Sequence, residues 1–140
     1  MTSQTKPSNP KDAVGILKRP FSVIPSGVVA ELGLAMYEGA RKYGRHNYRT
    51  VGVRGSVYYD AVFRHITQWW EGEDIDKDSG LSHITKAIAS LVVLRDSMMK
   101  GNWVDDRPPQ ISPDWQLMDK QVKVIAEKYP NAVPAHVEKE

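Results

Sequence analysis

The sequence contains no cysteine, which excludes a disulfide framework and any metal site built on thiolates. Its apolar runs are too short to span a bilayer, and residues 1–5 lack the charged and then apolar pattern of a signal peptide. Basic residues outnumber acidic ones by only 19 to 17, so net charge gives no reason to expect nucleic-acid binding. These absences predict a cytoplasmic protein with no membrane partner and no stable nucleic-acid partner.

What remains is the composition of a soluble globular chain. Of its 140 residues 41% are apolar and 26% charged, which suits one domain with a core of its own. No stretch alternates like a strand, and no repeat is visible. The sequence therefore predicts an all-α protein, a small bundle of about four helices. Because the apolar faces exceed what one small bundle covers, we expect a homo-oligomer, a dimer or tetramer.

Helices are predicted where apolar residues recur at helical spacing, over residues 26–42, 56–71, 79–99 and 114–128. Residues 79–99 have a broad apolar face, which is typical of a central bundle helix. The proline-rich residues 1–25 predict an irregular arm and not a helix. Residues 45–55 are rich in Gly, Asn and Arg and predict an exposed loop that can close over a ligand. The domain proper is then 26–128, followed by a flexible tail at 129–140.

Five carboxylates crowd the stretch 71–78, between two of the predicted helices. Such a cluster repels itself unless a cation lies among its members. A calcium loop of the EF-hand type is disfavoured, because Ser79 stands where the turn needs glycine and Thr85 where a bidentate glutamate belongs. Glu73 and Asp76 have the E-x-x-D spacing that suits Mg²⁺ or Mn²⁺, and so do Glu71 and Asp74, of which only one pair is needed. A solvated helix end without any metal is the alternative.

Two carboxylates of the first predicted helix, Glu31 and Glu38, are seven residues apart and therefore lie on one side of it. We expect them to complete a metal site with Glu73 and Asp76.

Cationic and aromatic residues surround this acidic run. Lys42, Tyr43 and Asn47 lie in or beside a glycine-containing loop, a composition suited to holding phosphate oxygens while a ring packs on a base. Arg64 and His65 add further donors. Each residue also has an ordinary structural interpretation, since lysine favours a helix C-terminus and histidine on an apolar face is commonly a buried, hydrogen-bonded residue.

Taken together, these residues resemble the phage dATP/dGTP diphosphohydrolase family, a MazZ-like branch of the all-α, MazG-like nucleoside triphosphate pyrophosphohydrolases. The resemblance spans residues 9–106 and rests on five segments, Asn9-Pro10-Lys11-Asp12-Ala13, Lys18-Arg19-Pro20, Glu38-Gly39-Ala40-Arg41-Lys42-Tyr43-Gly44, Arg64-His65 and Gly72-Glu73-Asp74-Ile75-Asp76 followed by Ser79-Gly80-Leu81-Ser82-His83. It departs from the MazG-like pattern in one respect, because no E-x-x-E precedes the E-x-x-D.

The resemblance implies a fold and a reaction. The fold is the MazG-like helical bundle. The reaction cleaves dGTP or dATP to the monophosphate and pyrophosphate with two or more Mg²⁺ or Mn²⁺ ions, in the host cytoplasm if a phage encodes the protein. The resemblance also implies a role in remodelling the nucleotide pool, including for DNA that contains 2-aminoadenine. It places Lys11, Asp12 and Lys18 of the arm at the nucleotide. It also makes Asp78 a spare carboxylate that can take the proton of the attacking water.

Two other functions are consistent with the sequence. A nucleotide-binding or regulatory module would use the same arm and loop without cleavage. A small helical DNA-binding or structural protein is suggested by the arginines of residues 45–54, but the near-neutral charge and the acidic run count against it.

Overall fold

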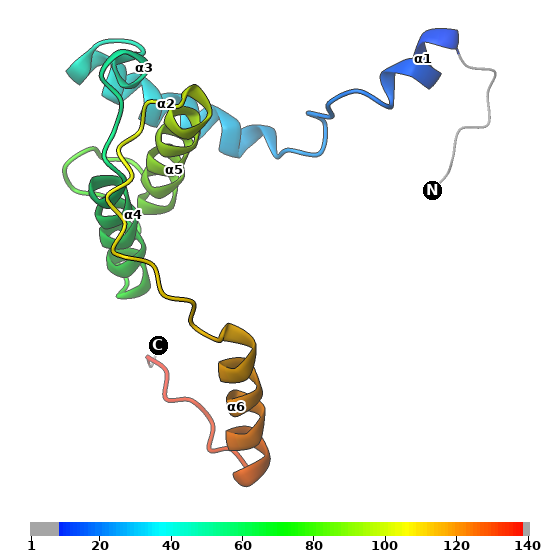
Figure 1. Cartoon of the computed structure of the whole chain (residues 1–140), viewed down its shortest axis with the longest axis vertical. Coiled ribbons are helices and arrows are strands. Elements are labelled where there is room, and N and C mark those ends of the chain that lie inside the picture. Colours follow the sequence, from blue (N-terminus) through cyan, green and yellow to red (C-terminus); the bar gives the residue numbers. More distant parts are fainter. Residues whose placement is uncertain (1–8, 139–140) are drawn as a thin grey trace. The chain divides into compact units, whose positions relative to one another are not determined.

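A computed structural model describes residues 9–138, and within them it contains only helices and connecting segments, with no strand. Six helices follow one another: α1 (Pro10–Gly15), α2 (Ser26–Tyr43), α3 (Asn47–Val51), α4 (Gly55–Trp70), α5 (His83–Lys100) and α6 (Trp115–Lys128) (Figure 1). The predicted all-α class and its four longer helices are confirmed. None of the helices in residues 9–138 is long and apolar enough to cross a membrane.

The chain divides into two compact units, one up to Asp106 and the other from Arg107 onward. The second unit contains α6, which begins where the Asp114 side chain accepts a hydrogen bond from the amide of Leu117 at 2.9 Å. All residues predicted to form a site belong to the first unit.

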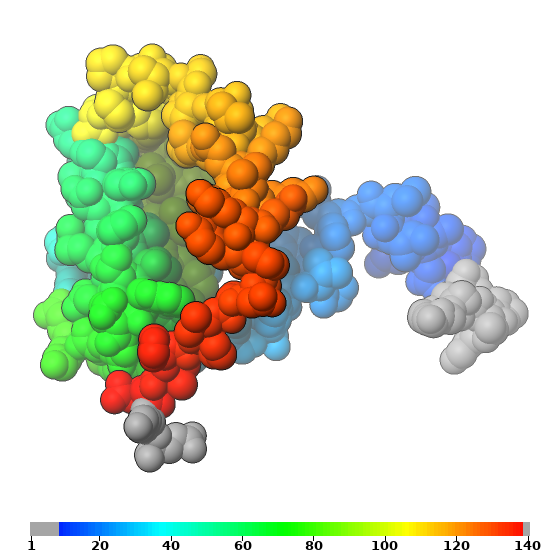
Figure 2. Space-filling view, turned by 90° about the horizontal axis from the view of Figure 1, so that it is seen from below, coloured from blue at the N-terminus to red at the C-terminus, as the bar shows by residue number. Residues whose placement is uncertain are grey.

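Helix α5 is the centre of the first unit, as the sequence predicted. It packs against α2, α3 and α4, and α4 and α5 lie side by side (Figure 1). In the space-filling view the side chains of α4 form part of the surface and α5 recedes behind them (Figure 2). The buried apolar residues are small, namely Ala35, Val53, Ala87 and Ala89. Small side chains let the helices approach closely, but they supply little apolar area.

Two short helices occur where the sequence predicted none, so these predictions were wrong. In the arm, Pro10 occupies the first position of α1, where its missing N–H is not needed, and the Asn9 side chain accepts from the Lys11 amide at 2.9 Å. In the predicted loop, α3 forms between His46 (φ 64°) and Gly52 (φ 76°).

Two predicted helix starts also need correction. Helix α5 begins at His83 and not at Ser79, because the Ser82 hydroxyl accepts from the amides of Ile84 and Thr85 and caps it there. Helix α4 begins at Gly55, one residue before the predicted start, and the amide of Ser56 in its first turn donates to the Asp106 carboxylate at 2.8 Å.

A backbone crossing ties the start of α4 to the end of α5. The amide of Val104 donates to the carbonyl of Val53 at 2.7 Å, and the amide of Gly55 donates to the carbonyl of Val104 at 3.0 Å. Beside them, a Cβ on Gly52 would come within 2.1 Å of the carbonyl oxygen of Asn102. Position 52 therefore requires glycine, for its positive φ and for this close approach.

We predict that Gly52→Ala lowers the free energy of unfolding by about 2 kcal/mol or more, because it combines a strained φ with a backbone clash. Chemical denaturation followed by circular dichroism measures the change. Gly27→Ala is the matched control, since nothing lies within 4 Å of a Cβ at this position in α2. Equal midpoints and slopes for the two variants would contradict the prediction.

Candidate functional site

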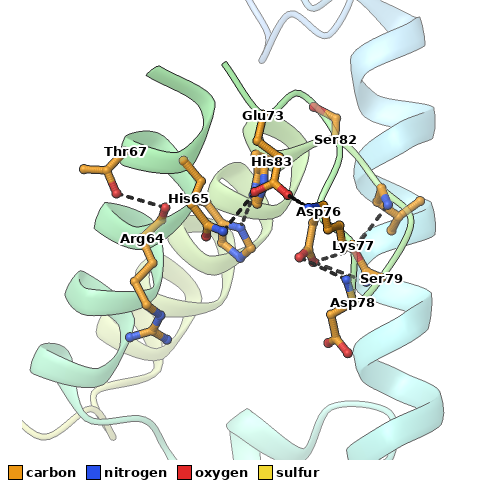
Figure 3. A network of polar contacts seen from close by, with 12 residues as sticks. Arg64, His65, Thr67, Glu73, Asp76, Lys77, Asp78, Ser79, Ser82 and His83 are labelled. Atoms are coloured by element: carbon orange, nitrogen blue, oxygen red, sulfur yellow. Dashed lines mark hydrogen bonds and ion pairs between the residues drawn. The ribbon is translucent and has the colours of Figure 1, made fainter. Parts of the chain in front are cut away.

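The first turn of α5 holds a completely buried histidine, His83, whose two ring nitrogens both have partners. Its Nε2 lies 3.1 Å from Oε2 of Glu73, in the loop between α4 and α5 (Figure 3). Its Nδ1 lies 2.8 Å from Nδ1 of His65 on α4. These two contacts join three side chains in a row, Glu73, His83 and His65, which we call the histidine chain.

Other residues hold Glu73 in place at the open end of this chain. The Gln68 amide donates to Oε2 of Glu73 at 3.0 Å, and Nζ of Lys77 lies 3.7 Å from its Oε1. Burial lowers the pKa of His65 at the other end, and the nearby His83, Lys86 and Arg64 lower it further, although Asp76 opposes the shift. His65 is therefore favoured in its neutral form.

Asp76 shapes the loop that carries Glu73. Its carboxylate accepts from the Ser79 hydroxyl at 2.7 Å and from the amides of Asp78 and Ser79, each at 3.3 Å (Figure 3). Burial raises the pKa of the Asp76 carboxyl, but these hydrogen bonds outweigh burial and leave the pKa below its ordinary value. The backbone of Asp76 also pairs with Leu81 and Gly80, so the loop is a defined turn.

Glu38 lies at the centre of an ion-pair network that joins α2, α5 and the loop. It accepts a hydrogen bond from the ammonium of Lys86, and Nζ of Lys42 lies 3.6 Å from its Oε2. Lys42 also lies 3.7 Å from the exposed carboxylate of Asp78. The hydrogen bond from Lys86 has the largest effect on the pKa of the Glu38 carboxyl and lowers it. Burial opposes this effect but is weaker, so the pKa stays below its ordinary value. Glu38 attracts Lys42 and raises the pKa of that ammonium.

Glu31, the other predicted ligand on α2, faces α5 at a different point. Its Oε1 accepts from the hydroxyl of the buried Thr85 at 2.7 Å. Successive residues of α5 therefore contact both carboxylates of α2, Thr85 at Glu31 and Lys86 at Glu38.

A cavity of about 440 Å³ opens beside this network, between the C-terminal half of α2, the turn into α3, and α5. Lys86 is part of its wall, so the cavity and the ion-pair network share a residue. Its other polar and aromatic lining includes Tyr37, Tyr43, Arg45, His46, Asn47, Tyr48 and Tyr58. Tyr43 and Asn47 were predicted to bind substrate.

The remaining predicted substrate contacts do not join these groups. Lys11 and Asp12 lie on α1 and Lys18 follows it, and all three are exposed without a described contact to the network. The side chain of Arg64 points away from the histidine chain although its neighbour His65 belongs to it (Figure 3). Arg64 lines a shallow hollow on α4 with Tyr59 and Phe63.

The donors available to a divalent cation are carboxylates, the ligand type that Mg²⁺ and Mn²⁺ prefer. Within residues 9–138 no group of three or more His, Asp or Glu side chains is placed to hold a metal ion by itself. Magnesium is commonly held by one or two carboxylates together with substrate phosphates and water. Glu73 and Asp76 belong to one turn and supply this type of ligand, although both carboxylates already accept hydrogen bonds within the protein (Figure 3). They do not form a complete protein cage.

From the described part of the site, sequence reasoning missed Thr85, Lys86 and two tyrosines of the cavity wall, Tyr37 and Tyr58. Their signal is weak, because a Thr and a Lys one turn into an apolar helix are ordinary residues. Only the packing of α5 against α2 shows that they reach Glu31 and Glu38.

Comparison with known proteins identifies the class. Residues 8–107 match the family described as dATP/dGTP diphosphohydrolase, N-terminal, and the match ends at the boundary of the first compact unit. The chain therefore belongs to this family of diphosphohydrolases, as the sequence motifs indicated.

One relative is the dATP/dGTP diphosphohydrolase of Salmonella phage PMBT28. It is 31% identical over 77 residues, which are 55% of this chain but only 26% of that protein. The match thus covers about a quarter of the relative's length. No solved structure matches the chain.

Proposed function

We propose that this chain is a metal-dependent pyrophosphohydrolase that cleaves dGTP, dATP or both to the monophosphate and pyrophosphate. The observation that carries the proposal is the position of Lys86, which lines a tyrosine-rich cavity and also pairs with Glu38 in a network of carboxylates and lysines. The family membership supports the same activity. Such a reaction would remodel a phage nucleotide pool, including one that serves 2-aminoadenine DNA.

We further propose that Mg²⁺ or Mn²⁺, two or more ions, bind with the substrate. Glu73 and Asp76 are the residues that would hold them, with Glu31 and Glu38 as the candidates from α2. When bound, such ions neutralise phosphate charge and acidify a bound water. Lys42 and Lys86, which pair with Glu38 in the free protein, would serve a related purpose by binding phosphate oxygens.

The cavity suits the nucleoside part of the substrate. Tyrosine rings provide flat apolar surfaces for a base, and the Asn47 amide offers both a donor and an acceptor to base edges. With the base in the cavity, the triphosphate would lie toward Lys86 and Lys42.

A nucleotide-binding module without hydrolysis is the alternative, and one observation favours it. Glu38 already pairs with Lys86, and Glu73 lies 3.7 Å from Lys77, so each of these carboxylates has a cationic partner without metal. Such a module would bind the nucleotide and leave it intact.

The first test is hydrolysis. Purified protein with Mg²⁺ is expected to release pyrophosphate from dGTP or dATP, and Glu73→Gln or Asp76→Asn should reduce turnover at least 100-fold, as expected when charge at a reacting phosphate is lost. Glu71→Gln is the matched control, because Glu71 is exposed and lies next to the same turn. Saturable binding with intact triphosphate after long incubation would establish the binding module instead.

The second test concerns the cavity. Tyr43→Ala should raise KM for the preferred nucleotide about tenfold, because stacking of one base on an aromatic ring contributes about 1–3 kcal/mol. Steady-state kinetics on the full chain measures the effect. Tyr129→Ala removes a ring of similar exposure that does not line the cavity, and it should leave KM unchanged. Similar KM values for both variants would place the base elsewhere.

We also propose that a second copy of this chain covers one face of α4. Tyr59, Phe63, Ile66 and Trp70 form one stripe at helical spacing, and each is at least 39% exposed. The buried apolar residues of the first unit are small, so this stripe provides some of the largest apolar side chains that the unit can bury. Aromatic side chains bury roughly 150–250 Å² each, so the stripe and its symmetry copy supply on the order of 1,000 Å², enough for a specific dimer.

Light scattering coupled to gel filtration tests this arrangement. The wild type is expected to run as a dimer or tetramer, and Phe63→Glu should shift it toward monomer because a buried unpaired charge is costly. Val51→Glu, on the exposed α3, is the control and should leave the mass unchanged. A monomeric wild type would refute the proposal.

A further inference from the structure

The short helix α3 is joined to α5 by a bidentate ion pair. Nε of Arg49 donates to Oδ2 of Asp96, and Nη2 of Arg49 donates to Oδ1, each at 2.8 Å. Two parallel hydrogen bonds between planar groups fix the orientation of both side chains as well as their separation. The hydrogen bond to Asp96 raises the pKa of Arg49, and the hydrogen bond from Arg49 lowers the pKa of Asp96, so both groups are charged at neutral pH.

A second contact holds the same helix. The side-chain amide of Asn102, two residues after α5, donates to the carbonyls of Tyr48 and Arg49 at 3.2 and 3.0 Å. The backbone has a positive φ on both sides of α3, at His46 and at Gly52, so α3 does not continue a neighbouring helix. A helix of five residues is not stable in water by itself, and its place therefore depends on such contacts.

The first residues of α3 belong to the cavity wall. Asn47 and Tyr48 line the cavity of about 440 Å³, and Asn47 also lines an adjoining hollow of about 360 Å³. Arg49 and Asp96 are not part of either wall. The ion pair therefore acts on the cavity only through the position of α3.

The ion pair is poorly suited to stabilising the whole fold. The side chain of Arg49 is 59% exposed, and exposed ion pairs contribute little because water and salt screen them. What the bidentate geometry supplies is a fixed placement of α3 against α5. We therefore expect its effect to be local, at the residues that α3 carries.

We propose that Arg49 and Asp96 are positioning residues of the nucleotide site, because their ion pair holds Asn47 and Tyr48 in the cavity wall. The inference rests on the proposed function, in which this cavity takes the nucleoside. When α3 is docked for only a fraction of the time, the apparent affinity for nucleotide falls by that fraction. The candidate metal ligands Glu73 and Asp76 are not part of this wall, so cleavage of bound nucleotide keeps its rate.

Steady-state kinetics on the full chain tests this role. Arg49→Gln and Asp96→Asn should each raise KM about tenfold, as expected if α3 is docked about a tenth of the time, while kcat stays within about twofold. The double variant should be no worse than either single variant, because each removes the same pair. An unchanged KM in the single variants, or effects that add in the double variant, would overturn the inference.

Arg54→Gln is the matched control for these variants. Arg54 is 58% exposed, and its Nη1 lies 3.9 Å from the Asp106 carboxylate, so it resembles Arg49 in exposure and in having a carboxylate partner. Neither Arg54 nor Asp106 lines the cavity. This variant should keep the wild-type KM, and a tenfold rise in it would show that the loss of any nearby arginine charge has the same effect.

Hydrogen exchange followed by mass spectrometry tests the docking of α3 without nucleotide or metal. The amides of residues 49–52 should exchange faster in Arg49→Gln and Asp96→Asn than in the wild type and Arg54→Gln, with the exchange of α5 unchanged. Equal exchange of residues 49–52 in all four proteins would contradict the proposed docking role.

The two measurements separate this inference from the proposed function. If the wild type binds dGTP or dATP without cleaving it, the proposed hydrolysis fails, and Kd takes the place of KM in testing the ion pair. If the wild type neither binds nor cleaves them, the proposed function fails and the role of the pair at a nucleotide fails with it. If the wild type is active and the variants match it in KM, only the inference about Arg49 and Asp96 fails.

Discussion

The candidate site is organised around a buried polar ring. His83 has no access to solvent, so each of its nitrogens must find its partner within the protein. One partner comes from α4 and the other from the loop that leads to α5, and both contacts are made. A displaced helix or a different loop conformation would leave a buried nitrogen unpaired, which costs about 1–3 kcal/mol. The contacts of one side chain thus set where α4, the acidic turn and α5 meet.

The late start of α5 follows from the same arrangement. If the helix began at Ser79, residues 79–82 would be wound into it and Asp76 would lose the Ser79 hydroxyl and amide that hold its carboxylate. Instead Ser82 caps the helix, and the amide of His83 bonds to the carbonyl of Asp74. The acidic residues therefore belong to a turn pinned by side chains, where repulsion between carboxylates is offset by directed hydrogen bonds.

The sequence predicted the elements better than their junctions. Periodicity located α2, α4, α5 and α6 and identified α5 as central, because apolar spacing reports which faces are covered. It missed α1 and α3, which are helices of only six and five residues set by a cap at Asn9 and by positive φ at His46 and Gly52. Within the site, local spacing pointed to Glu73 and Asp76. The pairings of Glu31 with Thr85 and of Glu38 with Lys86 join residues about 50 positions apart, and no local pattern predicts them.

The charge balance of the site bears on how it would receive a triphosphate. Glu38 is paired with two lysines, and Glu73 lies beside Lys77, so in the free protein each of these carboxylates already has a cationic partner. Phosphate oxygens compete for the same ammonium groups, because lysine binds phosphate as readily as carboxylate. If the proposed function is right, the lysines would exchange their carboxylate partners for substrate phosphates. The carboxylates would then lack a cationic partner and would attract divalent cations. Each of substrate and metal would then increase the affinity for the other. Such coupling would explain how a member of this diphosphohydrolase family can bind metal although its described residues form no metal cage by themselves.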